Sequence, residues 1–226
     1  MKILLAVALL PSFVGAVTLE EAQPAAGVIL KGDLGTKIVS PQGRPVAELT
    51  ALQKHIAFFD KDGDGIVTMS ETIQALRELG LTKTKARTSA AIIHLFLGPK
   101  TSGRWTLDVS VAGISRAKHG SDTGVFDAEG RFVPEAFDRI FERFDVDRSG
   151  SLTWVEIERM IAENAKVRPG DTTASKQEFQ LLFSIAADKT ERAAGGEPVK
   201  ALSRERLRSF YDGSLFYELA GQPVPR

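Results

Sequence analysis

The residues that say most about this chain's architecture are Asp60-Lys61-Asp62-Gly63-Asp64-Gly65-Ile66-Val67-Thr68-Met69-Ser70-Glu71. Side-chain oxygens stand at positions 1, 3, 5, 9 and 12 of this stretch, and a backbone carbonyl is available at position 7. Gly65 stands at position 6, where the chain must turn sharply with a positive φ. Calcium takes about six to eight oxygen ligands at flexible angles, whereas magnesium prefers a smaller octahedron that keeps its own waters. The stretch therefore predicts a calcium-binding loop whose ligands are Asp60, Asp62, Asp64, Ile66, Thr68 and Glu71.

A second stretch has the same form: Asp145-Val146-Asp147-Arg148-Ser149-Gly150-Ser151-Leu152-Thr153-Trp154-Val155-Glu156. It supplies oxygens at the same positions from Asp145, Asp147, Ser149, Ser151, Thr153 and Glu156. Because a hydroxyl replaces a carboxylate at position 5, we expect weaker calcium binding at this loop. A lone acidic turn between helices is often ordinary solvated turn chemistry, but two complete matches favour a pair of EF-hands. EF-hands commonly pair through a short strand at position 8, which would place Val67 beside Leu152.

Apolar residues at helical spacing precede and follow both loops. Gly80 is placed to end the helix after the first loop, and Pro134 suits the first position of the helix before the second. The other expected elements are a helix over 86–97, a strand over 105–109, a helix through Phe179, a flexible connector over 191–198 and a helix that begins at Ser203. The fold class we expect is mainly α: an EF-hand pair of helix-loop-helix units with a short two-stranded β link, a helical insertion and C-terminal helices.

The first residues have the pattern of a cleaved signal peptide. An apolar run over 3–10 follows Lys2, is about half the roughly 20 residues that span a bilayer, and precedes small residues. We expect residues 1–16 to be removed and the protein to follow the secretory pathway, either secreted or kept in the endoplasmic reticulum lumen; an uncleaved anchor is the alternative. An extended Gly- and Pro-rich arm over 17–46, a domain over 47–219 and a tail over 220–226 complete the expected organisation.

Composition excludes several classes of function. The 226 residues include 29 Lys plus Arg and 29 Asp plus Glu, so no net charge attracts nucleic acid. The chain has no Cys, which removes disulfides, thiolate nucleophiles and Cys-ligated zinc or haem. Any metal or cofactor must therefore use oxygen or imidazole ligands, and the imidazoles are His55, His94 and His119. Read alone, His55 and His119 are most often half-exposed surface residues.

Four strings resemble, in their order along the chain, the motifs of the caleosins, calcium-binding haem peroxygenases of oil bodies and endoplasmic reticulum. They are His55-Ile56-Ala57-Phe58-Phe59-Asp60, Ala117-Lys118-His119-Gly120-Ser121-Asp122-Thr123-Gly124, Glu129-Gly130-Arg131-Phe132-Val133-Pro134 and Tyr211-Asp212-Gly213-Ser214-Leu215-Phe216. The resemblance runs from about Ala47 to Leu219 and implies a caleosin-like domain over 47–219. It implies that His55 and His119 are the catalytic residues and hold haem b, and that the first loop binds Ca²⁺. His94 has no counterpart in these motifs.

The resemblance implies a reaction in which one oxygen of a lipid hydroperoxide is transferred to an unsaturated fatty acid or related lipid, by epoxidation or hydroxylation. An imidazole can hold ferric haem on one side and leave the other side to the peroxide. Residues 90–97 are interrupted by His94 and followed only by Gly98-Pro99, where caleosins carry a proline-rich lipid-inserting segment. We therefore expect peripheral rather than deep attachment to a membrane or lipid droplet.

Two other functions fit the same residues. A non-enzymatic EF-hand protein at a lipid surface would use the calcium loops while its histidines never hold haem. A calcium sensor that opens to bind a partner helix is disfavoured, because sensor grooves are rich in Met and this chain has three.

Overall fold

The computed structural model describes residues 28–30, 37–39, 49–118, 123–167, 172–193 and 195–225. The expected signal peptide, most of the N-terminal arm and His119 lie outside these described residues. Within the arm, strands β1 (Val28–Leu30) and β2 (Lys37–Val39) pair antiparallel.

In the first half of the domain, the first acidic loop lies between two helices and contains a short strand. Its elements are α1 (Ala51–Ala57), β3 (Ile66–Val67), α2 (Met69–Glu78), α3 (Lys83–Ser102), β4 (Val109–Ser110) and the 3-10 helix η1 (Ile114–Ala117). Thr50 and Thr68 begin α1 and α2, and each accepts a hydrogen bond from the backbone N–H three residues on. Gly80, with φ of 91°, follows the end of α2 as the sequence predicts.

The second half repeats this plan. Its elements are α4 (Pro134–Phe144), β5 (Ser151–Thr153), α5 (Trp154–Val167), α6 (Thr173–Ala186), β6 (Lys189–Arg192), β7 (Pro198–Ser203), α7 (Arg204–Asp212) and α8 (Leu215–Leu219). Pro134 is the first residue of α4, and the Ser203 side chain caps α7, so both sequence-based helix starts are confirmed. The mainly helical class is also confirmed, and the structure adds small antiparallel sheets.

The two loop strands do not pair with each other, so the expected β link between them is wrong. Val67 of β3 lies opposite Val109 of β4, and Leu152 of β5 lies opposite Leu202 of β7. Each loop strand pairs with a strand that is nearer along the chain, and closing a shorter loop costs less chain entropy. Residues 51–117 and 134–212 therefore form two similar units, in place of one pair interrupted by an insertion.

Two local expectations also differ from the structure. The strand expected over 105–109 is only Val109–Ser110, because the side chains of Thr106 and Asp108 form a local turn that uses the Asp108 N–H. The connector expected over 191–198 is the turn of a hairpin: β6 pairs with β7, which completes a sheet in the order β5-β7-β6. The sequence did not indicate this strand pair, because β6 is largely exposed and its residues are mostly charged, without the apolar alternation of a half-buried strand.

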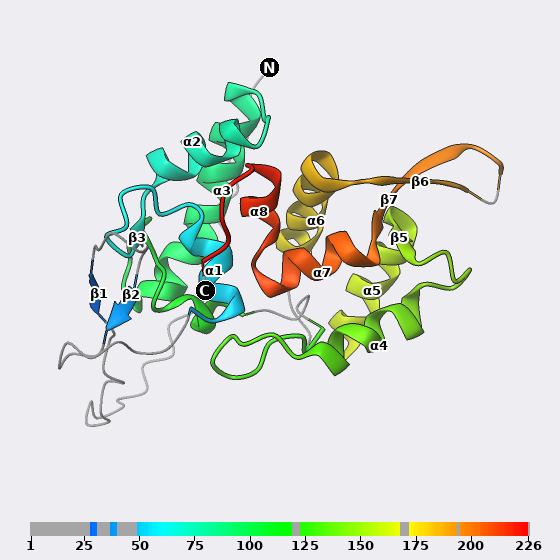
Figure 1. Ribbon diagram of the computed structural model, residues 1–226, viewed down its shortest axis with the longest axis horizontal. Helices are drawn as coiled ribbons and strands as arrows, with labels where there is room; N and C mark the ends of the chain where they lie inside the picture. The colour runs from blue at the N-terminus through cyan, green and yellow to red at the C-terminus, as the bar shows by residue number, and fades with distance from the viewer. Residues whose placement is uncertain are drawn as a thin grey trace, which may run out of the picture.

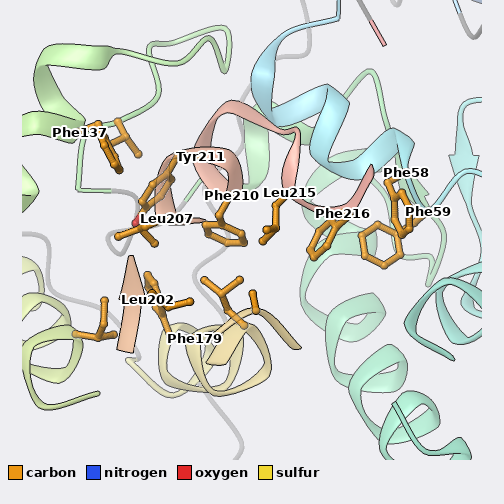
Figure 2. Packing of buried hydrophobic residues seen from close by; sticks show 14 of the residues in the cluster. Phe58, Phe59, Phe137, Phe179, Leu202, Leu207, Phe210, Tyr211, Leu215 and Phe216 are labelled. Carbon is orange, nitrogen blue, oxygen red and sulfur yellow. The ribbon is translucent and has the colours of Figure 1, made fainter. Parts of the chain in front are cut away.

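Aromatic residues of α7 and α8 join the two units. Figure 1 shows these helices, in orange and red, between α1 and α3 on one side and α4 to α6 on the other. Figure 2 shows Phe210 and Leu215 along the line of buried side chains that runs from Phe137 to Phe58. The Phe216 ring centroid lies 5.1 Å from that of Phe59, and the Phe210 centroid lies 6.3 Å from that of Phe179. One core therefore serves both units.

The helices in the described part of the chain all lack the combination of length and apolar character that a membrane span requires.

Candidate functional site

A cavity of about 530 Å³ lies at the junction of the two units. Helices α1, α3, α5, α6 and α7 all contribute to its lining, which is mainly apolar. The α3 side is formed by Ile92, Ile93, Phe96 and Leu97, and the α6 side by Leu181, Leu182 and Ile185. A cavity of this volume and character is typical of a site for a cofactor or a lipid-sized ligand.

His55 of α1 borders this cavity. Its ring makes edge-to-face contacts with Phe210 and Phe216, at centroid distances of 4.9 and 4.6 Å. The Nδ1 atom lies 3.3 Å from the carbonyl oxygen of Phe210. Because a carbonyl oxygen can only accept, Nδ1 must carry the proton, and the neutral ring then keeps its lone pair on Nε2. Burial lowers the pKa of His55 to about 4, against the weaker opposing effect of the Phe210 carbonyl, so the imidazole is neutral near pH 7.

The turn between α7 and α8 holds these aromatic rings against α1. Gly213 has φ of 86°, and a Cβ atom on it would lie 2.3 Å from the carbonyl oxygen of Ala51. No other residue type fits this close approach without a shift of the backbone. In the same region the Tyr217 hydroxyl donates to the carbonyl oxygen of Lys54, 3.2 Å away. Contacts from Gly213 and from Tyr217 therefore hold α1, and with it His55, against the turn.

His94 has a structural role. It is fully buried in α3, where Nε2 lies 2.8 Å from the Thr72 hydroxyl and Nδ1 contacts the carbonyl oxygen of Leu107. Both ring nitrogens are occupied, so His94 has no atom left to bind a metal, in agreement with its lack of a counterpart in the motifs. Burial also lowers the pKa of His94.

The first acidic loop gathers carboxylates that could hold a cation. Oxygens of Asp60, Asp62 and Glu71 lie within 4.8 Å of one another. The Glu71 carboxylate also accepts hydrogen bonds from the backbone N–H groups of Lys61, at 2.9 Å, and of Thr68, at 2.8 Å. Burial, together with the nearby carboxylates, raises the pKa of Asp60 although two Gly N–H groups lower it. A bound cation would remove this repulsion. Asp64 instead accepts from the Ile66 N–H.

The second acidic loop has the same arrangement. Oxygens of Asp145, Asp147 and Glu156 lie within 4.8 Å of one another, and Thr153 donates to Glu156 from both its N–H and its hydroxyl. The structure adds one carboxylate that the sequence pattern missed. Glu191 of β6 accepts hydrogen bonds from the hydroxyls of two loop residues, Ser149 at 2.8 Å and Ser151. Only the β5-β7-β6 sheet brings it there.

Basic residues near the second string differ in their surroundings. Arg116 donates to the carbonyl oxygen of Thr101, and Lys118 borders the cavity and donates to the carbonyl oxygen of Asp127. Arg131 forms exposed ion pairs with Asp127, at 3.3 Å, and with Glu129. His119, which follows Lys118, lies outside the described residues.

Asn164 and Glu178 are among the polar residues of the cavity that the sequence patterns did not indicate. Glu178 could have been found, because it stands at helical spacing from Leu182 and Ile185 on an otherwise apolar face. Loss of water around its carboxyl raises the pKa of Glu178 to about 7. Asn164 gives no comparable signal, since its neighbours in sequence are polar or small.

Comparison with known proteins agrees with these features. The family model described as "Caleosin related protein" matches residues 47–220. A peroxygenase of Lilium longiflorum is 33% identical over 183 residues, covering 79% of this chain and 73% of the relative. Probable peroxygenase 4 of Arabidopsis thaliana is 35% identical over 179 residues, covering 76% of this chain and 86% of the relative. No solved structure matches the chain. The chain therefore belongs to the caleosin family.

Proposed function

We propose that this chain is a calcium-binding haem peroxygenase that uses lipid hydroperoxides to oxygenate unsaturated fatty acids and related lipids. The observation that carries the proposal is the position of His55, a neutral imidazole with Nδ1 occupied, at the border of a large apolar cavity. Two relatives that are named peroxygenases support the same activity. The balanced reaction converts a hydroperoxide and an alkene into an alcohol and an epoxide.

The residues of the cavity fit haem b. His55 offers Nε2 as the iron ligand, because the hydrogen bond to the Phe210 carbonyl holds the other nitrogen and orients the ring. The apolar side chains of α3 and α6 would surround the porphyrin and an acyl chain and would exclude water. Haem, when bound, would supply the oxygen-transfer chemistry, and the protein would supply the ligand, the access and the orientation. We include His119 as a second haem-associated histidine on the resemblance alone.

We further propose that both acidic loops are EF-hands that bind Ca²⁺. Each gathers three carboxylates around one point and follows the twelve-residue ligand pattern. The first loop is coupled to His55, because α1 carries the histidine and leads directly to Asp60. A change in that loop on loss of calcium would therefore move the helix that holds the imidazole.

The lipid surface and the secretory route remain part of this proposal. Leu95, in the second half of α3, and Trp105 and Leu107, in the loop after it, are 51%, 78% and 42% exposed. Exposed apolar side chains of this kind suit shallow contact with a membrane or lipid droplet. Flotation with lipid droplets tests the contact: we expect the protein to float but to be released by a carbonate wash. N-terminal sequencing of the mature protein, which we expect to begin near Val17, tests entry into the secretory pathway.

The test of the activity is peroxide-dependent epoxidation of oleic acid by haem-reconstituted protein, with and without a calcium chelator. We expect epoxide formation that the chelator reduces. A folded, calcium-loaded protein that takes up no haem would instead favour a non-enzymatic EF-hand protein at a lipid surface.

A further inference from the structure

One face of α3 forms a side of the cavity and ends at a positive charge. The residues of this face recur at helical spacing: Ser89, Ile92, Ile93, Phe96, Leu97 and Lys100. At 1.5 Å per residue, the face extends about 17 Å along the helix axis. Helix α3 is described over its whole length, and Lys100 is the one charged side chain that it contributes to the lining.

Lys100 is accessible both to solvent and to a ligand. Its side chain is exposed although it borders the cavity, so it lies where the cavity opens to solvent. Among the described residues, the ammonium group has no ion-pair or hydrogen-bond partner. The apolar part of the α3 face therefore leads to a cation whose donors are available to a ligand.

A second lysine, Lys118, borders the cavity from a segment that packs against this end of α3. The Thr101 carbonyl oxygen accepts a hydrogen bond from the Arg116 guanidinium. A Cβ atom on Gly113 would collide with the same oxygen, so the two backbones are in close contact. Lys118 follows η1 directly, and one of its three N–H groups donates to the Asp127 carbonyl oxygen. Two N–H groups of Lys118 remain for a ligand.

The two lysines therefore belong to the same end of the cavity, because Lys100 precedes Thr101 and Lys118 is two residues beyond Arg116. The charge of the surrounding chain is one-sided. Residues 79–121 contain seven Lys or Arg and one acidic residue, Asp108, although the whole chain has 29 of each charge. An excess of positive charge beside an apolar opening raises the local concentration of anions.

We propose that Lys100, assisted by Lys118, binds the carboxylate of an otherwise apolar ligand whose remaining atoms lie along the α3 face. The apolar part of such a ligand is buried in the cavity while its charged group stays near water. Two ligands of the proposed peroxygenase function have this chemistry, a fatty acid and the propionates of haem, and the choice of these two rests on that function. Neither lysine was assigned a role above.

The first arm of the test uses haem-free protein. Oleic acid and oleyl alcohol, which differ only in the head group, displace the neutral dye Nile red at about pH 8, where the acid is ionised. We expect the wild-type protein to bind the acid roughly fivefold more tightly than the alcohol, close to the largest effect that an exposed ion pair usually has. Lys100→Met keeps the apolar stem and removes the charge, so it should lower this ratio to about twofold or less.

Lys85→Met is the matched control. Lys85 lies in the first turn of the same helix, is exposed and does not border the cavity. Its Cα lies about 22 Å from that of Lys100 along the helix axis, so the same loss of charge occurs far from the ligand. We expect Lys85→Met to keep the preference for the acid. Equal effects of the two variants would show that only the overall charge of α3 matters, which would overturn the assignment of Lys100.

The second arm distinguishes the two carboxylate ligands. Haem and its dimethyl ester, in which the propionates are uncharged, are titrated into the same three proteins, and the Soret absorbance reports binding. A preference for haem over its ester that depends on Lys100, without a preference for oleic acid over the alcohol, would assign the carboxylate to haem. The opposite result would assign it to the fatty acid.

The inference and the proposed function fail in different ways. A wild-type protein that prefers the charged member of neither ligand pair would overturn the carboxylate site, even if it takes up haem. A protein that prefers oleic acid through Lys100 but takes up no haem would keep the carboxylate site and reject the peroxygenase function.

Discussion

The Nδ1 atom of His55 hydrogen-bonds the carbonyl oxygen of Phe210, 3.3 Å away, and so joins the helix before the first acidic loop to a helix near the C-terminus. This single contact sets the tautomer of the imidazole and the direction of its remaining lone pair. It also places the site at the junction of the two units, where α1 and α7 meet. The geometry of His55 therefore depends on the turn that packs α7 and α8 onto α1.

Gly213→Ala tests that dependence. A Cβ at this position would lie 2.3 Å from the Ala51 carbonyl oxygen, so we expect a loss of more than about 2 kcal/mol in the free energy of unfolding. Gly80→Ala is the matched control, because Gly80 has a similar φ of 91° but no atom within 4 Å of the added Cβ. We expect it to cost only about 1 kcal/mol. Urea unfolding measures both, and equal losses would show that Gly213 matters only for its φ.

Acid should weaken the fold through His55. Burial lowers the pKa of His55 from 6.5 to about 4, so between these values the unfolded chain binds a proton that the folded chain does not. The free energy of unfolding is therefore at its highest above pH 6.5, where neither state of His55 is protonated, and it falls as the pH is lowered towards 4. His55→Gln should reduce this loss, which urea unfolding at pH 7 and pH 4.5 can measure. The same pH dependence in both proteins would contradict the assigned burial.

His94→Ala should show that His94 stabilises the fold and does not bind the cofactor. Both nitrogens of the buried ring make hydrogen bonds, so we expect the unfolding free energy to fall by about 2–4 kcal/mol. Haem content per folded molecule should stay close to that of the wild-type protein. A specific loss of haem without loss of stability would show that His94 serves the cofactor.

Calcium affinity should depend on position 12 of each loop. Glu71→Gln and Glu156→Gln each alter the residue that supplies two oxygens at once, so each should weaken one calorimetric binding event by at least roughly tenfold. Stronger binding at the first loop is expected from four carboxylates against three. Glu191 reduces that contrast, so Glu191→Gln should weaken the second event alone. An intact tighter event in Glu71→Gln would reverse the ranking.

Local signals in the sequence predicted most of the helices around the loops. Pro134 and Ser203 begin α4 and α7 where the pattern placed them, and Gly80 follows the end of α2, because caps act over a few residues. The pairing of Val67 with Val109 was missed, since short strands carry little information about which partner they choose. The strings that resemble the caleosin motifs include His55 and Gly213, but they do not explain why these two residues lie close together.

The cavity could not be predicted from local patterns at all. It exists because faces of α3 and α6, far apart in the sequence, border the same space. The contact of Glu191 with the second loop also depends on tertiary structure, because the pairing of β6 with β7 brings it there. Charged and polar residues of this kind look like ordinary surface residues until the fold places them.

The role of His55 as the haem ligand is tested most directly by the absorption spectrum of purified protein after addition of haem, for the wild-type chain and for His55→Ala. We expect a Soret band with about one haem per wild-type chain, and loss of most of this bound haem in His55→Ala while the circular dichroism spectrum stays unchanged. Equal haem binding by both proteins, with the same Soret band, would contradict the assignment of His55 as the ligand.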